Sequence, residues 1–220
     1  MTTEDLIVQL AGSAGPIQPL APPMQRLWRW TAGAVATTVA GVALIGVRAD
    51  AGAMSREIGF LVLAALTLAT ALVSAGVALV LSVPGAERSA SQRWAPIAVG
   101  TGWAALLTWS ILTGGSAIPR IAAFPFHIGC LIQIVALALV PAWGLFRMLR
   151  RAAPLRLFWC AGLASLAAFA LAAAGVQFIC PINDPAHLLV GHFTPAATLA
   201  LAGALIGSRA LARRSRAVER

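Results

Sequence analysis

Six long runs without a charged residue constrain this chain more than any other feature. They are 18 to 29 residues long, and they cover residues 30–47, 58–86, 94–119, 121–146, 157–183 and 185–208. A helix needs about 20 mostly apolar residues to cross the hydrocarbon of a bilayer, where only helices or closed barrels satisfy their backbone hydrogen bonds. The runs are too long for barrel strands and do not alternate as such strands do. The sequence therefore predicts an all-α integral membrane protein with six transmembrane helices in three hairpins.

The expected spans are approximately residues 28–47, 58–82, 95–113, 125–146, 157–179 and 186–207. Composition agrees with this class, since 60% of the residues are hydrophobic and 10% are charged. The spans form a domain of residues 28–208, between an N-terminal segment of residues 1–27 and a basic tail of residues 209–220. A catalytic domain typically needs about 50 residues or more. No connection outside the spans offers that length, so we do not expect an enzyme.

Arginine placement predicts the orientation of the helices. All 16 basic residues are arginines, and 13 of them fall on the side that includes both ends of the chain. The opposite side carries Arg48, Arg56 and Arg120. Basic residues near helix ends are retained in the cytoplasm, so both termini are expected to be cytoplasmic in a bacterial inner membrane. The net charge of +9 is explained by this topology signal, and we expect no direct binding of nucleic acid.

Soft and titratable side chains gather on the arginine-poor, outer side. Cys130 and Cys180 are expected near the outer ends of neighbouring helices, and His127, His187 and His192 fall on the same side. His127 and Cys130 share a helix face because they are three residues apart. His187 and His192 are five apart, which is about 140° around an α-helix, so we do not expect both to face one ion. The candidate metal set is therefore His127, Cys130, Cys180 and His192.

Three interpretations of Cys130 and Cys180 remain open at this point. Free cysteines often pack as small buried hydrophobic residues, which is our interpretation of Cys160. A disulfide suits an oxidising compartment, but along continuous helices the two positions differ in depth by about 10 Å. Because a disulfide needs Cα atoms within about 7 Å, the chain after Ile179 would have to fold back inward, which Pro181 permits. Thiolates and imidazoles also bind soft or borderline ions of the zinc or cadmium type. Asp184 is expected to cap the last helix rather than to bind metal.

The N-terminal segment contains a short amphipathic helix followed by a proline-rich arm. Thr2 and Thr3 precede acidic residues, as at a helix start, and Leu6, Ile7 and Leu10 form one apolar stripe. Four prolines between residues 16 and 23 favour an extended chain. This arrangement suits docking into a groove on a partner protein. The alternatives are that the segment lies on the membrane surface or is disordered.

Several short stretches, taken in order, resemble the NrsF-like family of membrane-embedded anti-sigma factors. They are Asp5-Leu6-Ile7 with Leu10, Pro16-Ile17 with Leu20 and Pro23, Ser82-Val83-Pro84-Gly85, Cys130, Arg150-Arg151-Ala152-Ala153-Pro154, Cys180-Pro181 with Asp184, and His192. One departure is Gly191, where the resemblance implies an aromatic residue. The stretches span nearly the whole chain, so the resemblance bears on the whole protein.

The resemblance implies a function and a set of site residues. The cytoplasmic N-terminus would hold an extracytoplasmic-function (ECF) sigma factor inactive, and Cys130 and Cys180 would sense oxidative or heavy-metal stress. The residues that we assign to sigma-factor binding are Asp5, Leu6, Ile7, Leu10, Pro16 and Leu20.

Two other functions remain as alternatives. A small transporter, for example of metal ions, would be revealed by an uptake assay, but the six runs lack the intramembrane charges that usually mark ion-coupled pathways. A membrane thiol oxidoreductase normally needs a vicinal cysteine pair, and this chain has none. The anti-sigma function is the one that we carry forward.

Overall fold

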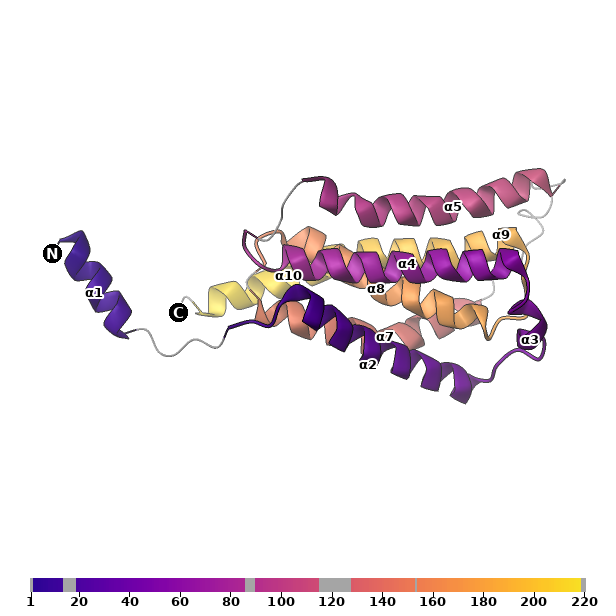
Figure 1. Ribbon diagram of the computed structural model, residues 1–220, viewed down its shortest axis with the longest axis horizontal. Helices are drawn as coiled ribbons and strands as arrows, with labels where there is room; N and C mark the ends of the chain where they lie inside the picture. The colour runs from indigo at the N-terminus through magenta and orange to yellow at the C-terminus, as the bar shows by residue number, and fades with distance from the viewer. Residues whose placement is uncertain (1, 14–18, 86–89, 115–127, 153, 219–220) are drawn as a thin grey trace.

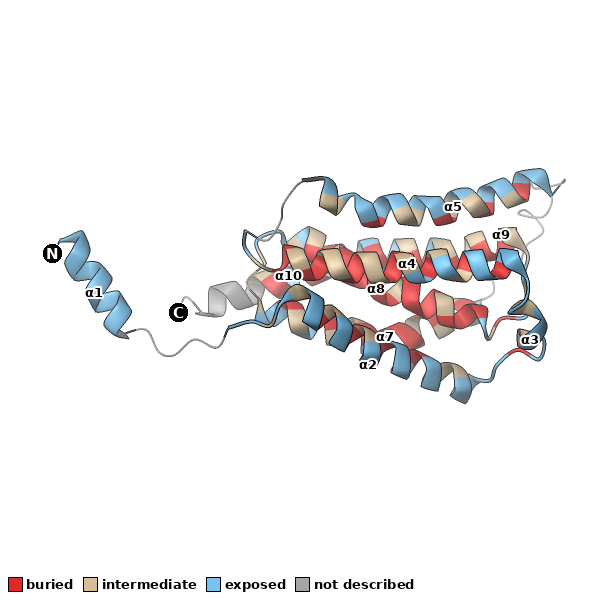
Figure 2. Cartoon of the chain, in the orientation of Figure 1, coloured by how far each residue is buried: buried red, intermediate tan, exposed pale blue. Residues whose placement is uncertain are grey.

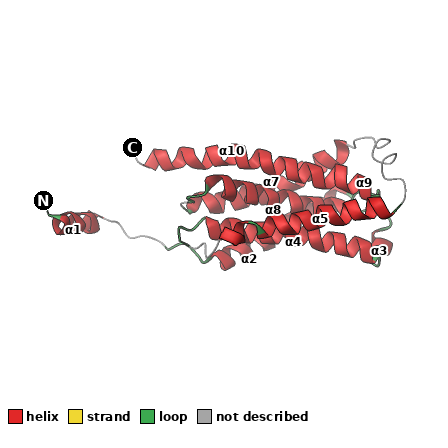
Figure 3. Ribbon diagram, turned by 90° about the horizontal axis from the view of Figure 1, so that it is seen from above, coloured by secondary structure: helices red, strands yellow, loops and turns green. Residues whose placement is uncertain are grey.

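The computed structural model describes residues 2–13, 19–85, 90–114, 128–152 and 154–218. Within these ranges the chain is helical and contains no β-strand, which confirms the predicted all-α class (Figures 1 and 3). The long helices are α2 (Pro23–Ile45), α4 (Ile58–Leu81), α5 (Ala95–Thr113), α7 (Ile128–Arg151), α8 (Leu157–Gln177) and α10 (Thr194–Val218). The short elements are α1 (Thr3–Ser13), α3 (Ala51–Met54), the 3₁₀-helix η1 (Ala90–Arg93), α9 (Pro185–His187) and the π-helix η2 (Leu188–Phe193).

Among the described residues, five helical stretches are long and apolar enough to cross a membrane. They are Ile58–Leu81, Ser91–Thr113, Ile128–Arg151, Leu157–Gln177 and Pro185–Ala212. These five correspond to five of the six predicted spans. The remaining predicted span, residues 28–47, is occupied by α2, which has 23 residues and lies alongside the others but does not meet the same criterion of composition (Figure 1).

Helix α8 forms the centre of the bundle, and its small residues explain why. Two thirds of its most apolar stretch is buried, a larger share than in the other candidate spans, and half of its buried residues are alanines (Figure 2). Small side chains allow membrane helices to approach closely. The approach to α10 is close enough that a Cβ added at Gly203 would overlap the side chain of Ser165, and one added at Gly162 would lie 3.0 Å from the Cβ of Ala204.

Some helix boundaries differ from the prediction for identifiable reasons. Helix α2 begins at Pro23, five residues before the predicted start, because a proline in the first turn costs no backbone hydrogen bond. Helix α7 continues to Arg151, beyond the predicted end at residue 146, since basic side chains are favourable in the last turn of a helix. The predicted start of this span, residues 125–127, lies outside the described residues. The last span is not one α-helix but α9, η2 and α10 in succession.

Helix α2 is a peripheral element that buries only Arg26, Trp30, Ala34 and Thr38. Polar contacts attach its first turns to the bundle. The guanidinium of Arg26 donates to the Ser82 hydroxyl at 3.2 Å and to the Met148 carbonyl at 2.8 Å. The Trp30 indole donates to the Pro141 carbonyl at 2.9 Å. The start of α2 therefore lies beside the ends of α4 and α7, and its last turn lies at the opposite end of the bundle (Figure 1).

Candidate functional site

Cys130 and Cys180 lie together at the end of the bundle opposite the start of α2. Both are free and buried, and the Cys130 thiol donates to the Cys180 sulfur with the two Sγ atoms 3.7 Å apart. Cys130 is in the first turn of α7, whereas Cys180 follows the end of α8. The chain therefore folds back after Ile179, as a contact between the two cysteines required, and the difference in depth of continuous helices does not apply.

The chain turns back at the end of α8, and this turn positions Cys180. Helix α8 ends at Gln177, two residues before the predicted end of its span. The amides of Phe178 and Ile179 donate to carbonyls three residues earlier, which tightens the last turn of α8, and the amide of Cys180 donates to the Val176 carbonyl at 2.8 Å. Pro181, which has no amide hydrogen, then prevents any continuation of the helix. The sulfur of Cys180 is thereby brought back to the level of Cys130.

His187 and His192 both join the two cysteines, which corrects the expectation that they would not face one site. The residues between them form the π-helix η2, in which the amide of Thr194 donates to the Leu189 carbonyl five residues earlier. The i→i+5 hydrogen bonds widen the turn, so residues five apart stack on one face. The two imidazole rings are 5.2 Å apart between centroids, and both are buried. The nearest ligand atoms of all four side chains lie within 4.8 Å of one another.

The four side chains fit a tetrahedral site for a soft or borderline ion. With zinc bonds of about 2.3 Å to sulfur and about 2.0 Å to nitrogen, a tetrahedron has edges of about 3.8 Å between sulfurs and about 3.5 Å between sulfur and nitrogen. The sulfurs are 3.7 Å apart, and the Nε2 atom of His187 lies 3.2 Å from Cys180 and 3.6 Å from Cys130. His192 is 1% exposed, and the polar partner of its imidazole is the Cys180 sulfur, so its other ring nitrogen is buried without a partner. A buried polar atom in this state is costly unless a ligand binds it.

Because Gly191 has no side chain, the imidazole ring of His187 can lie against its backbone. A Cβ added at Gly191 would lie 3.2 Å from Cε1 and 3.5 Å from both nitrogens of the His187 ring. An aromatic residue, which the family resemblance implied at this position, would therefore displace the imidazole. The departure at Gly191 and the placement of His187 in the cluster are thus linked.

Three other predictions from the sequence concern Asp184, His127 and Cys160. The Asp184 carboxylate accepts from the amides of Ala186 and His187 at 2.9 and 3.2 Å, which confirms its role as a helix cap. His127, which we had included among the metal ligands, lies outside the described residues. Cys160 is buried in the apolar core and lies outside the cluster, in agreement with a packing role.

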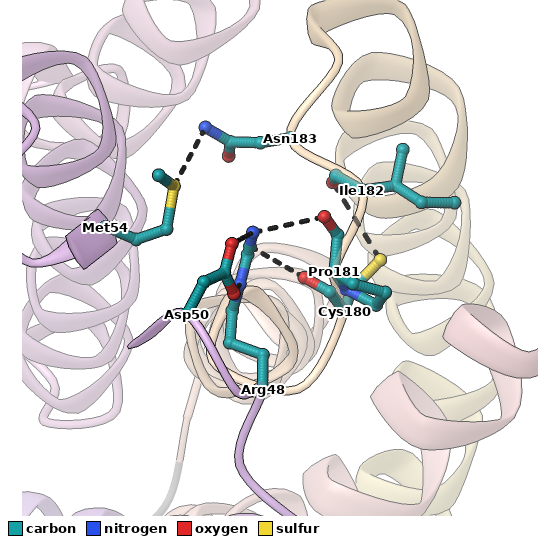
Figure 4. Close-up of polar contacts among 7 residues, drawn as sticks. All are labelled: Arg48, Asp50, Met54, Cys180, Pro181, Ile182 and Asn183. Carbon is teal, nitrogen blue, oxygen red and sulfur yellow. Dashed lines mark hydrogen bonds and ion pairs between the residues drawn. The ribbon is translucent and has the colours of Figure 1, made fainter. Parts of the chain in front are cut away.

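Arg48 supports the cluster from the connection between α2 and α3, and the sequence analysis did not identify it. Its guanidinium donates to the carbonyl oxygens of Cys180 and Pro181 at 2.8 and 3.1 Å (Figure 4). Asp50 binds the same guanidinium with both carboxylate oxygens, at 2.6 and 2.8 Å. This ion pair raises the pKa of Arg48 and lowers the pKa of Asp50. The only sequence signal was that Arg48 is one of three arginines on the arginine-poor side.

The environment of Cys180 favours its thiolate. The hydrogen bond from the Cys130 thiol lowers the pKa of Cys180, and the contact with His187 acts in the same direction. A thiolate is the form of cysteine that reacts with oxidants and binds metal. The two cysteines, Cys130 and Cys180, are therefore placed both for oxidation and for metal binding.

The N-terminal residues form the predicted helix, α1. The Thr2 hydroxyl accepts from the Asp5 amide at 3.2 Å, and the Asp5 carboxylate accepts from the Thr2 amide at 2.8 Å, which lowers the pKa of Asp5. This reciprocal pair is a capping box. Residues 2–12 are all exposed, including the apolar stripe of Leu6, Ile7 and Leu10 (Figure 2). Leu20 is also exposed, while Pro16 lies outside the described residues.

Comparison with known proteins gives one match. The family model described as NrsF, negative regulator of sigma F, matches residues 10–212, which include all the long helices as far as Ala212 in α10. This result confirms the resemblance that the sequence analysis identified. No curated protein and no solved structure matches the chain.

Proposed function

The chain belongs to the NrsF family of negative regulators of sigma F, and on that premise we propose that it is a membrane anti-sigma factor. In this proposal the N-terminal segment sequesters an ECF sigma factor at the cytoplasmic face of the bacterial inner membrane. The sigma factor is released when Cys130 and Cys180 sense oxidative or heavy-metal stress at the outer side. The protein acts by binding and release and is not an enzyme.

The proposal includes α2 as a sixth span, with both termini in the cytoplasm. Helix α2 exposes Val35, Val39, Leu44 and Ile45, and a helix with apolar residues on its outer face suits contact with lipid. Its length of 23 residues is sufficient to cross the hydrocarbon layer. An even number of spans agrees with the arginine-rich side including both chain ends.

Helix α1 and the following arm are the proposed sigma-factor ligand. Leu6, Ile7 and Leu10 are 40 to 60% exposed on a helix too short to be stable alone in water. Such a stripe gains free energy by entering an apolar groove on a partner, as in other helix-in-groove complexes. Asp5, Pro16 and Leu20 complete the proposed set, with Asp5 capping the helix and the prolines limiting the chain entropy lost on binding.

The four-residue cluster carries the sensing part of the proposal. Four potential ligands within 4.8 Å offer a stimulus two chemical routes. A soft ion of the zinc or cadmium type would bind as the cysteine thiols lose their protons to water. A peroxide would instead oxidise the pair to a disulfide: the two thiols lose two electrons and two protons, and the peroxide is reduced to two water molecules.

The available free energy is sufficient for a switch. Shifting a two-state equilibrium from 1:99 to 99:1 takes about 5.5 kcal/mol of differential binding. Four Cys and His ligands in structural zinc sites supply about 10–16 kcal/mol at neutral pH. The stimulus can therefore drive release even if a third of its binding energy is used to rearrange the helices.

The proposal is tested by co-purification from detergent extracts. The full chain, a chain lacking residues 1–18 and an Ile7→Asp variant are compared in the same detergent. We expect the full chain to capture a sigma factor, and we expect both N-terminal variants to lose it, because the apolar stripe is removed or charged. Capture that does not depend on residues 1–18 would contradict the assignment of the docking segment, and no capture by the full chain would contradict the anti-sigma function.

A further inference from the structure

The carbonyls around Cys180 accept hydrogen bonds from Arg48, which lies 132 positions away in the sequence. Its guanidinium donates to the Cys180 and Pro181 carbonyls, and its backbone amide donates to the Phe178 carbonyl at 2.9 Å. Three carbonyls of one short connection therefore accept from the same residue. Figure 4 shows the guanidinium between this connection and Asp50.

The contact between Arg48 and the connection around Cys180 is buried and geometrically fixed, unlike an ion pair on the surface. The Arg48 side chain is 2% exposed, and the bidentate pair with Asp50 fixes the plane of the guanidinium while its remaining donors face the carbonyls. A planar, bidentate geometry is specific to arginine, because a lysine ammonium cannot satisfy two carbonyls and a carboxylate in one plane. A displacement of the Cys180 backbone must therefore either break these hydrogen bonds or move Arg48.

Arg48 follows the last residue of α2 by only three positions. The intervening turn is compact, since the Gly46 amide donates back to the Val42 carbonyl at 3.0 Å. Helix α2 then runs about 35 Å, at about 1.5 Å per residue, to its first turn, where Arg26 is buried against Ser82 and Met148. Leu20, the last residue of the proposed sigma-factor ligand, precedes this turn by three positions.

Helix α2 is less firmly packed than the two long helices that end at the cysteines. It buries four of its 23 residues, whereas α7 buries seven of 24 and α8 buries 14 of 21. A shift of α2 as a rigid body would disturb few packed side chains, but it would displace both Arg26 and the arm that continues from it.

We propose that Arg48 is the positioning residue that couples the Cys130–Cys180 site to the cytoplasmic arm by linking the Cys180 backbone to helix α2. When a soft ion draws the four ligand atoms, which lie within 4.8 Å of one another, to tetrahedral edges of about 3.5 Å, the connection of residues 178–184 is repositioned. Arg48 follows its carbonyl acceptors, and α2 carries the displacement to the arm. This inference rests on the proposed anti-sigma function and names the route by which its signal crosses the membrane.

The test measures cadmium binding at the four-residue cluster and release of the sigma factor separately. The full chain in detergent, bound to the sigma factor that it captures, is titrated with Cd²⁺ while bound cadmium and released sigma factor are both measured. For Arg48→Gln we expect cadmium affinity close to that of the wild type, but a cadmium concentration for half-release that is higher by about tenfold, which is within the usual range of coupling between sites. Arg56→Gln is the matched control, because Arg56 is an exposed arginine of the same connection.

A second variant tests the route without removing any contact of Arg48. Val47 is 55% exposed and lies between Gly46 and Arg48, so Val47→Gly adds backbone freedom within the proposed linkage. We expect it to shift release in the same direction as Arg48→Gln, while Val47→Ala, which removes the same side chain with less added freedom, behaves like the wild type. This variant keeps the test decisive if Arg48→Gln fails to fold.

The outcomes distinguish the inference from the function on which it rests. Release curves of Arg48→Gln and Val47→Gly that coincide with the wild type would overturn the coupling role, as would a parallel loss of cadmium binding and release. A wild-type chain that binds cadmium but never releases its sigma factor would instead contradict the proposed function itself.

Discussion

Removing the imidazole of His187 should weaken metal binding strongly, although the sequence alone had excluded this residue from the site. His187 is fully buried, and its Nε2 atom lies 3.2 and 3.6 Å from the two sulfurs. If four ligands share about 10–16 kcal/mol, one contributes about 3 kcal/mol, which corresponds to about a 100-fold change in Kd. We therefore expect His187→Ala to bind Cd²⁺ about 100-fold more weakly than the wild type.

The measurement is a competition titration of the purified full chain against a chelator of known affinity. His187→Gln is tested in parallel because it fills most of the vacated volume, which separates loss of a ligand from creation of a cavity. Asp184→Asn is the matched control: it lies in the same connection, caps the helix and contributes no atom to the cluster. A Kd for His187→Ala within about a factor of three of the wild type, less than about 0.7 kcal/mol, would refute the assignment.

Three further predictions concern the bundle and its pH dependence. Trp30→Phe removes the indole hydrogen bond to the Pro141 carbonyl and should lower the free energy of unfolding in detergent by about 1 kcal/mol. Gly203→Leu forces a side chain into the space of Ser165 and should destabilise the chain by about 1–3 kcal/mol or prevent its folding. Asp50 has a lowered pKa in the folded chain, so its ion pair stabilises the fold above the ordinary carboxyl pKa of about 3.9. That contribution is lost as the pH falls through the lower folded value, and Asp50→Asn should remove this part of the acid sensitivity measured by thermal unfolding.

Matched controls exist for the two packing predictions. Trp143 is 62% exposed, so Trp143→Phe should leave stability unchanged, and a Cβ at Gly33 meets no atom within 4 Å, so Gly33→Leu should be tolerated. Equal effects of Trp30→Phe and Trp143→Phe would contradict the role of the buried hydrogen bond. A Gly203→Leu chain as stable as the wild type would contradict the close approach of α8 and α10.

The positions of the long helices along the sequence were predictable because a bilayer-spanning helix must meet a simple rule of length and composition. A charge-free run of about 20 residues has few alternatives to a spanning helix, and α4, α5 and α8 begin at the predicted residues 58, 95 and 157. The cap at Asp184 was predictable for a similar reason, since an Asp-Pro pair before an apolar run is a local signal. These features depend on residues close together in the chain.

The geometry of the site was only partly predictable, because it depends on contacts between distant residues. Ideal α-helical geometry placed His187 and His192 on different faces, whereas the π-helix η2 brings them together. A π-helix has no strong sequence signature, and the space at Gly191 acquires its meaning only when the His187 ring is in place. The attachment of Arg48 to Cys180 spans 132 positions and could not be read from either segment alone.

The most direct test of the central claim is a stoichiometric titration of the complex. The purified chain with its captured sigma factor is titrated with Cd²⁺, and release is plotted against cadmium bound per chain, for the wild type and for Cys130→Ser and Cys180→Ser. The account predicts that wild-type release is complete at one bound ion per chain and that neither variant releases its sigma factor at the same concentration. Release by both variants at the wild-type concentration, or a wild-type complex that remains intact with the site filled, would contradict it.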